Sequence, residues 1–112
     1  MSELLAKNGV KLSLYALVDG LPEDSRASLL ENVDTEKFKK IFNDSDMMST
    51  IDCLFDNDLN VSRTARKMYM HRNTLIYRLN KFKEITSLDV RVFSDAVVFI
   101  LIHTLYCAKK EG

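Results

Sequence analysis

The residues of this chain that could do chemistry are two histidines, two cysteines and a set of charged side chains. Catalysis by His71 would need a nucleophile or a carboxylate close by, and its sequence neighbours offer neither. His103 lies in an apolar stretch, where a histidine is most often a core residue. Cys53 and Cys107 match neither a disulfide framework nor a zinc-ligand cluster, so we interpret them as small core residues with free thiols. The sequence predicts no catalytic residue, metal or cofactor, and the chain is not expected to be an enzyme.

The charged residues are unevenly distributed, although they sum to zero over the whole chain. Residues 1–60 carry 6 basic and 12 acidic side chains, a net charge of −6, and residues 84–112 carry 3 and 4, a net charge of −1. A field of one sign is typical of a surface that binds phosphate groups, whereas a solvated helix face usually alternates charges. The basic segment, residues 61–83, has no acidic residue and seven basic ones: Arg63, Arg66, Lys67, Arg72, Arg78, Lys81 and Lys83.

The length and composition indicate a small helical protein. A chain of 112 residues fits one domain, or a small domain with an attached helical arm. Only 3 Gly and 1 Pro are present, which argues against a β-sandwich or a disordered chain. The longest apolar stretch, residues 96–108, is shorter than the roughly 20 residues of a membrane span. No secretory signal opens the chain, so we expect a cytoplasmic protein without a membrane partner.

Apolar spacing and helix-capping residues predict a series of helices separated by short turns. Residues 1–45 are expected to form an N-terminal helical arm, and residues 46–112 a DNA-binding domain. The expected fold class is all-α, a helical bundle that contains a helix-turn-helix. The predicted helices cover residues 10–21, a short segment after Pro22, a segment that begins near Asp34, and residues 46–56, 61–68, 72–84 and 93–108.

Two of these helices carry the basic segment and are joined by a three-residue turn, which is helix-turn-helix spacing. Asn60 or Ser62 caps the first helix. Ala65 lies where a bulky side chain would push the two helices apart. The middle of such a turn often needs a positive φ, and a Tyr69 held there costs about 1–2 kcal/mol. Either the turn has another conformation or packing offsets the strain.

In the second helix, Leu75, Leu79 and Phe82 fall within about 60° of one another and define its buried stripe. The opposite face is polar and free of acidic residues over residues 72–83. Asn can pair with adenine and Arg with guanine in the major groove of DNA, while basic residues further along the helix contact phosphates. This exposed face and its edges comprise Arg72, Asn73, Thr74, Ile76, Tyr77, Asn80 and Lys81.

Residues 60–79, NVSRTARKMYMHRNTLIYRL, resemble the C-terminal helix-turn-helix of the PucR and CdaR regulators of purine catabolism and sugar-diacid use in bacteria. The family pattern resembles N-x-S-x-T-A-x-x-L-x-x-H-R-N-T-L-x-Y-R-L, from which this chain departs mainly at Met68. The segment Leu88-Asp89 and the closing apolar helix also match, and the hairpin is more loosely similar to that of the nucleoid protein Fis. The resemblance implies a DNA-facing set of His71, Arg72, Asn73, Thr74, Tyr77 and Arg78.

The exposed face and the resemblance together predict a transcriptional regulator that binds duplex DNA as a homodimer associated with the nucleoid. A dimer is expected because such proteins read two half-sites, and one hairpin buries too little surface for tight binding. Residues 93–108 or 10–21 carry the apolar surface that would form its interface. The predicted DNA-binding residues are Ser62, Arg63, His71, Arg72, Asn73, Thr74, Tyr77, Arg78, Asn80 and Lys81.

Two other functions fit the same residues. The first is a nucleoid-architectural protein that bends DNA with little sequence preference, as the similarity to Fis implies. The second is a protein-interaction module in which the hairpin has lost DNA binding and the acidic first 60 residues dock a partner.

The route by which a signal reaches the chain is a separate expectation. Members of the family usually carry effector-sensing domains ahead of the DNA-binding end, and this chain begins almost at that end. We therefore expect a separate sensor protein as partner, constitutive DNA binding, or a loss of regulation.

Overall fold

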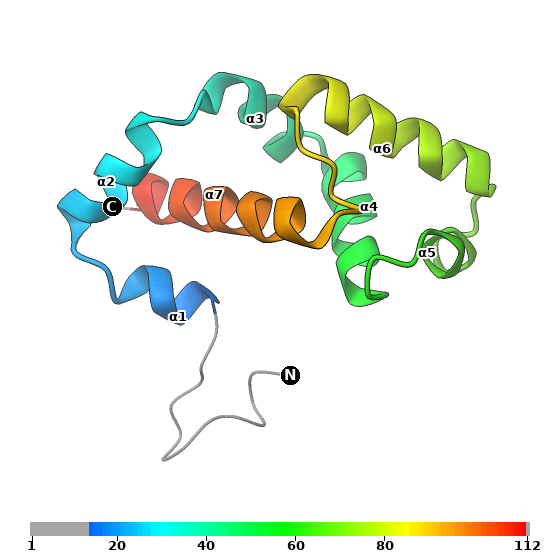
Figure 1. Cartoon of the computed structure of the whole chain (residues 1–112), viewed down its shortest axis with the longest axis horizontal. Helices are drawn as coiled ribbons and strands as arrows, with labels where there is room; N and C mark the ends of the chain where they lie inside the picture. Colours follow the sequence, from blue (N-terminus) through cyan, green and yellow to red (C-terminus); the bar gives the residue numbers. More distant parts are fainter. Residues whose placement is uncertain (1–13, 112) are drawn as a thin grey trace, which may run out of the picture. The chain divides into compact units, whose positions relative to one another are not determined.

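The computed structural model describes residues 14–111, with side chains described for residues 16–107. This range contains helices and no strand, so the predicted all-α class is confirmed (Figure 1). Residues 10–13 of the predicted first helix lie outside the described range. The seven helices are α1 (Leu14–Asp19), α2 (Glu23–Glu31), α3 (Thr35–Phe42), α4 (Ser45–Asp56), α5 (Val61–Lys67), α6 (Arg72–Thr86) and α7 (Phe93–Glu111).

The described chain divides into two compact units. One contains residues 14–33 and 100–111, and the other contains residues 34–99. Helix α7 therefore begins in the second unit and ends in the first. The predicted boundary at residue 45 separates an N-terminal arm from a DNA-binding domain. It concerns which segments fold independently, and it stays a prediction.

The unit of residues 34–99 has an aromatic core. The rings of Phe82 and Phe99 meet edge to face with centroids 5.1 Å apart, and the ring of Phe38 lies 6.3 Å from that of Phe99. Such pairs stabilise a core beyond the area that they bury. Helices α3, α4 and α6 complete the core with fully buried aliphatic side chains, namely Ile41, Ile51, Leu54, Leu75 and Leu79. Because Leu75, Leu79 and Phe82 belong to this core, the core holds α6 in place and so positions the side chains on its exposed face.

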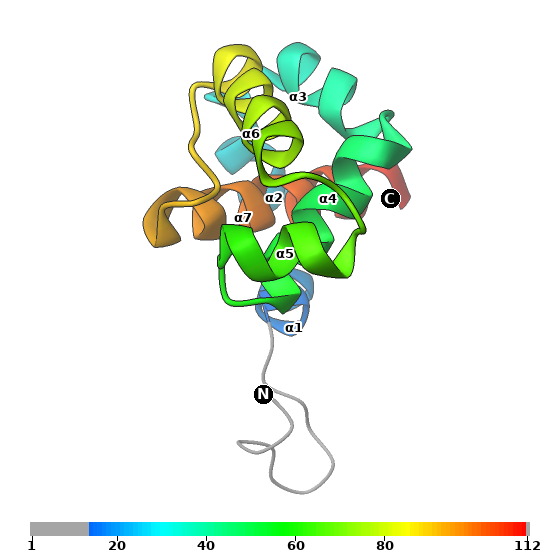
Figure 2. The same ribbon diagram turned by 90° about the vertical axis from the view of Figure 1, so that its right-hand side faces the viewer.

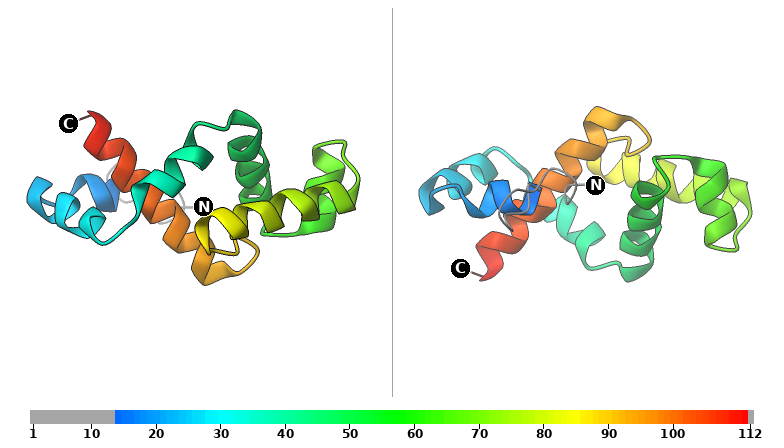
Figure 3. Two further views of the ribbon diagram at one scale, coloured as in Figure 1. Left: turned by 90° about the horizontal axis from the view of Figure 1, so that it is seen from above. Right: turned by 90° about the horizontal axis from the view of Figure 1, so that it is seen from below.

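Side-chain caps set where α3, α4, α5 and α6 begin. The carboxylate of Asp34 accepts a hydrogen bond from the backbone N–H of Glu36 at the start of α3, and that of Asp44 accepts from Met47 in α4. Such caps satisfy N–H groups that the first turn leaves unpaired. Asn60 does the same for α5, as described below. Figure 2 shows that the axes of α5 and α6 cross one another, and Figure 3 shows the loop of residues 87–92 that joins α6 to α7.

The unit of residues 14–33 and 100–111 has a smaller core. Val18 of α1, Leu30 of α2 and Leu105 of α7 form a buried cluster, and Leu101 packs against it. Cys107 of α7 lies with its Sγ 3.5 Å from Nε2 of His103. His103 and Cys107 are half-buried, and so is Cys53 of α4. The sequence predicts core positions for these three residues, whereas the structure places them at the boundary of the core. Within residues 14–111, no helix is both long enough and apolar enough to cross a membrane.

Candidate DNA-binding surface

Helix α5 begins with a side-chain cap. The Oδ1 atom of Asn60 accepts a hydrogen bond from the backbone N–H of Arg63 at 2.9 Å, so Asn60 is the N-cap and Ser62 is not. The hydroxyl of Thr64 donates to the carbonyl of Asn60 at 2.7 Å and is fully buried. Ala65 is also buried, as expected for a residue packed between the two helices. The exposed side of α5 therefore presents Ser62 and Arg63 to solvent.

The turn between α5 and α6 is left-handed at Tyr69, where φ is 54°. The backbone N–H of Met70 donates to the carbonyl of Ala65 and that of Tyr69 to the carbonyl of Arg66, which is the Schellman arrangement that usually takes a glycine. The turn thus has the conformation that favours glycine, despite the side chain. The Tyr69 ring is 97% exposed, so its own packing does not offset the strain.

His71 caps α6. Its Nδ1 accepts a hydrogen bond from the backbone N–H of Asn73 at 3.1 Å. An accepting Nδ1 places the proton of the neutral ring on Nε2, which is then a donor available to another group. His71 is therefore the N-cap of α6, and its exposed ring can also donate a hydrogen bond at the start of the helix.

The exposed face of α6 agrees with the predicted helical wheel. Leu75, Leu79 and Phe82 are fully buried, whereas Tyr77, at the centre of the opposite face, is 66% exposed. No acidic side chain interrupts α6 before Glu84, and the amide, guanidinium and hydroxyl groups of its first turn all reach solvent. The exposed members of the predicted DNA-binding set on this helix are Arg72, Asn73, Thr74, Tyr77, Asn80 and Lys81.

Arg78 is turned inward from that face. Its Nη1 donates a hydrogen bond to Oγ1 of Thr50 at 3.1 Å, and Thr50 is fully buried in α4. The Thr50 hydroxyl in turn donates to the carbonyl of Asp46 at 2.8 Å. Arg78 is half-buried and ties α6 to α4, while the rest of its guanidinium keeps donors for another acceptor.

Arg63 of α5 faces an acidic neighbour. Its Nη1 lies 4.0 Å from Oδ2 of Asp58, a carboxylate whose side chain is 92% exposed. Exposed pairs of this kind contribute little and are screened by salt. Arg63 therefore remains able to exchange this partner for a phosphate.

Acidic residues border one edge of the exposed face of α6. A shallow hollow of about 220 Å³ lies between the start of α4 and α6, and Asp44 and Asp46 line it together with Tyr77, Arg78 and Lys81. Counting charges along the basic segment does not reveal these two aspartates, because they precede it by many residues. Their negative charge offsets part of the positive potential of Arg78 and Lys81 at this edge.

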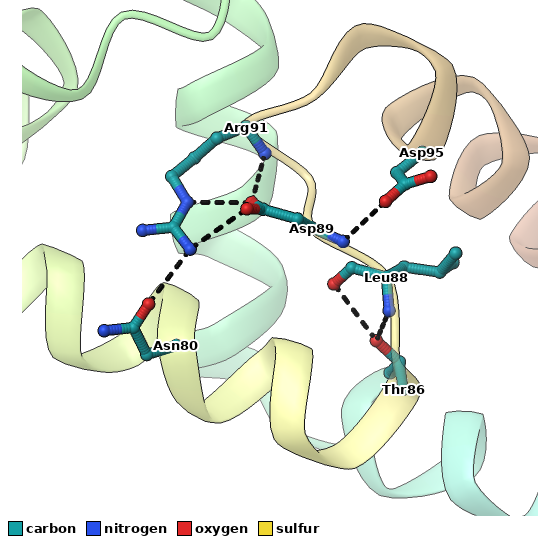
Figure 4. A network of polar contacts seen from close by, with 6 residues as sticks. All are labelled: Asn80, Thr86, Leu88, Asp89, Arg91 and Asp95. Carbon is teal, nitrogen blue, oxygen red and sulfur yellow. Dashed lines mark hydrogen bonds and ion pairs between the residues drawn. The ribbon is translucent and has the colours of Figure 1, made fainter.

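A second polar network joins the later part of α6 to the loop before α7 (Figure 4). Arg91 donates from Nε to Oδ1 of Asp89 at 2.7 Å and from Nη2 to Oδ1 of Asn80 at 2.9 Å. Its guanidinium holds the pKa of the Asp89 carboxyl below its usual value, mainly through the side-chain hydrogen bond. Sequence reasoning missed Arg91, because it lies outside the basic segment, and its link to Asn80 spans 11 residues.

No group of three or more His, Cys, Asp or Glu side chains that could hold a metal ion occurs in the described part of the chain. The exposed groups of α5 and α6 described above are hydrogen-bond donors and basic side chains. A short first helix, a tight turn and a longer second helix with an exposed polar face define the helix-turn-helix class of DNA-binding domain.

Comparison with known proteins places the chain within this class. The family model of the PucR C-terminal helix-turn-helix domain matches residues 47–102, which are half of the chain, and the chain belongs to this family. The matched residues include both helices of the hairpin, the Arg91 network and the first part of α7. The resemblance noted from residues 60–79 is confirmed.

Several curated bacterial proteins are similar to the chain. Uncharacterized protein YxkF of Bacillus subtilis is 34% identical over 84 residues, which are 74% of this chain and 27% of the relative. The carbohydrate diacid regulator of Escherichia coli is 32% identical over 87 residues, which are 78% of this chain and 22% of the relative. The purine catabolism regulatory protein of Bacillus subtilis is 32% identical over 69 residues, which are 51% and 13%.

The chain thus spans about a quarter of the length of the first two relatives and less of the third. No solved structure matches it at the significance that these relatives reach. The family assignment therefore rests on sequence, and the arrangement of side chains rests on the structure described above.

Proposed function

We propose that this chain regulates bacterial transcription by binding a specific sequence in duplex DNA through α6. The observation that carries the proposal is the exposed face of α6, which presents Arg72, Asn73 and Thr74 in its first turn, within the family's helix-turn-helix. Side chains early in a recognition helix reach base edges in the major groove. The names of two relatives, a carbohydrate diacid regulator and a purine catabolism regulatory protein, support a regulatory role.

The remaining predicted residues have positioning roles in this proposal. Ser62, Arg63 and His71 face solvent at the beginnings of α5 and α6, where phosphate contacts fix the register of such domains. Tyr77 and Lys81 extend the face along α6, and Arg78 contributes chiefly by tying α6 to α4. The chain is proposed to act in the cytoplasm on nucleoid DNA and to have no catalytic activity.

We further propose that the chain acts as a homodimer. Exposed apolar side chains support this on both predicted interface segments, because Phe93 of α7 is 75% exposed, Val98 of α7 is 41% exposed and Leu17 of α1 is 59% exposed. Exposed apolar side chains that form a contiguous patch mark protein–protein interfaces. Signal input through a separate sensor protein is the remaining part of the proposal.

The function is tested by selecting genomic DNA fragments with the purified chain and footprinting the fragments recovered. A regulator should protect a discrete site in each fragment. Dispersed protection would favour the architectural alternative, and recovery of no DNA above background would favour the protein-interaction module. An Asn73→Ala variant serves as control, because it keeps the charge of the chain and should lose the discrete site while retaining weak general binding.

A further inference from the structure

Asn80 has a fixed amide orientation, because its partner can only donate hydrogen bonds. The Oδ1 atom of Asn80 accepts from Nη2 of Arg91 at 2.9 Å. A guanidinium has no acceptor, so the amide oxygen must face Arg91, and the two N–H donors on Nδ2 must point away from it. Figure 4 shows Nδ2 of Asn80 on the side away from Arg91. Asn80 is exposed, so these donors face solvent.

Arg91 is itself held rigidly by Asp89. Its Nε donates to Oδ1 and its Nη2 to Oδ2 of that carboxylate at 2.7 and 3.2 Å, and its backbone N–H donates to Oδ1 at 3.0 Å. The backbone N–H of Asp89 donates in turn to Oδ2 of Asp95 at 2.9 Å. The two side chains are only 25% and 20% exposed, so solvent competes weakly for these bonds. The loop before α7 therefore holds the Nη2 donor of Arg91 in a fixed position against Asn80 of α6.

The position of Asn80 along α6 indicates which DNA group it meets. At about 1.5 Å of rise per residue, Asn80 lies roughly two turns beyond Arg72 and Asn73, where a recognition helix leaves the groove. The acceptors at that depth are phosphate oxygens rather than base edges. A neutral amide whose rotamer is already fixed can donate to a phosphate oxygen at little further entropic cost. The side-chain entropy of Asn80 is lost before DNA binds rather than during binding.

We propose that Arg91 is a positioning residue for DNA binding, which holds the Asn80 amide so that Nδ2 donates to a DNA phosphate. This inference rests on the proposed function. Arg91 acts here through geometry and not through charge, because the Asp89 carboxylate offsets its positive charge. The arrangement assigns a role to the family-matched loop after α6, which sequence reasoning left without one.

The test is a double-mutant cycle with Asn80→Ala, Arg91→Lys and the double variant, measured on a selected genomic fragment and on random duplex DNA. Lysine keeps the positive charge near Asp89. A single ammonium, however, cannot reproduce the planar guanidinium geometry that donates to Asp89 and to Asn80 together. Each single variant should weaken binding about threefold to tenfold on both DNAs, as expected for loss of one hydrogen bond. The double variant should bind as Asn80→Ala does, and the salt dependence should not change in any of them.

Two results would overturn the inference while leaving the proposed function intact. One is a normal affinity for either single variant, and the other is a double variant whose loss is the product of the two single losses. Failure of the unsubstituted chain to bind DNA would instead contradict the proposed function. Circular dichroism checks that each variant is folded at the assay temperature.

A second measurement keeps the inference testable should Arg91→Lys fail to fold. In ¹⁵N NMR spectra of the unsubstituted chain, adding DNA should shift the side-chain NH₂ signals of Asn80. Those of Asn57 are the matched control, because its Nδ2 donates to the carbonyl of Cys53 at 2.8 Å and Asn57 is buried. Unshifted Asn80 signals at saturating DNA would also overturn the inference.

Discussion

Asn73 and Arg78 show how the side chains of one helix divide between recognition and support. Asn73 is exposed in the first turn of α6, and its backbone N–H is already paired with the His71 ring. Its side chain is thus presented by an ordered backbone. Arg78 lies one and a half turns later, and its guanidinium donates a hydrogen bond to Thr50 of α4. Base recognition is therefore expected from the start of the helix and not from its middle.

Replacing Arg72 or Asn73 with alanine should cost about 1–3 kcal/mol on the preferred DNA site and little on random DNA, because base contacts carry the discrimination. Fluorescence anisotropy titrations on both duplexes measure the two losses. Equal losses on specific and random DNA would show that these residues clamp phosphates, and the architectural alternative would gain.

Replacing Tyr69 with glycine should leave the free energy of unfolding unchanged or raise it by up to about 1 kcal/mol. Tyr69 has a φ of 54° and a ring that is 97% exposed, so the substitution relieves strain and removes no packing. Tyr77→Gly is the control, because Tyr77 is exposed in the interior of α6, where glycine should lower the free energy of unfolding by about 0.5 kcal/mol. Urea unfolding compares the two, and a clear loss for Tyr69→Gly would contradict this account.

At the residue scale, sequence reasoning found the exposed face of α6 because the apolar period alone defines its opposite side. It could not find the partner of Arg78, since Thr50 lies 28 residues earlier and nothing local indicates that contact. It also missed Arg91, whose role depends on a loop that folds back onto α6. Long-range polar contacts of this kind depend on tertiary packing, which a helical wheel does not contain.

At the scale of elements, the helix ends are set by a few polar residues and by left-handed backbone at Asp58, Leu59, Tyr69 and Ser87. Asn60 starts α5, the Schellman arrangement at Tyr69 ends it, and His71 starts α6. These signals are local, which explains why α4, α5 and α6 fall within two residues of their predicted bounds. The angle at which α5 meets α6 depends instead on how the side chains of the two helices pack.

Asn60→Ala should destabilise the chain by about 1 kcal/mol, because the N–H of Arg63 loses its cap. Ser62→Ala is the matched control, since Ser62 is exposed inside the first turn and does not cap the helix. Thermal unfolding followed by circular dichroism measures both variants. A larger loss for Ser62→Ala than for Asn60→Ala would contradict the assignment of the cap.

Lys81→Ala should weaken binding to every DNA sequence alike and reduce the salt slope by about one unit, as expected for loss of one phosphate contact. Lys81 is exposed on the later part of α6. Lys40→Ala removes the same charge from an exposed position of α3, outside the basic segment, and should leave the slope unchanged. Titrations at several salt concentrations provide the slopes, and identical slopes for all three proteins would remove Lys81 from the interface.

At the scale of the whole molecule, a chain with no net charge concentrates its basic residues on one hairpin. The division of the chain into two compact units could not be predicted, because residues 14–33 pack with residues 100–111 from the other end of the sequence. The buried cluster of Val18, Leu30 and Leu105 contains residues from both of these segments. Hydrophobic spacing identifies each helix but not the partner that covers it.

Dimerisation belongs to this scale, because two half-sites of DNA require two hairpins. Sedimentation equilibrium at micromolar protein should show a species of twice the 12.9 kDa chain mass, at least when DNA is present. Phe93→Ser removes an exposed ring from α7 and should weaken the dimer without lowering the stability of the fold. Only monomers, with and without DNA, would contradict the dimer.

The ratio of two affinities measures whether α6 reads a DNA sequence. The purified chain is titrated at one salt concentration against a selected genomic fragment and against a scrambled duplex of the same length and composition. The account predicts that the selected fragment binds about a thousandfold more tightly, the lower end of the range for specific recognition. Equal affinity for the two duplexes, or no binding to either, would contradict it.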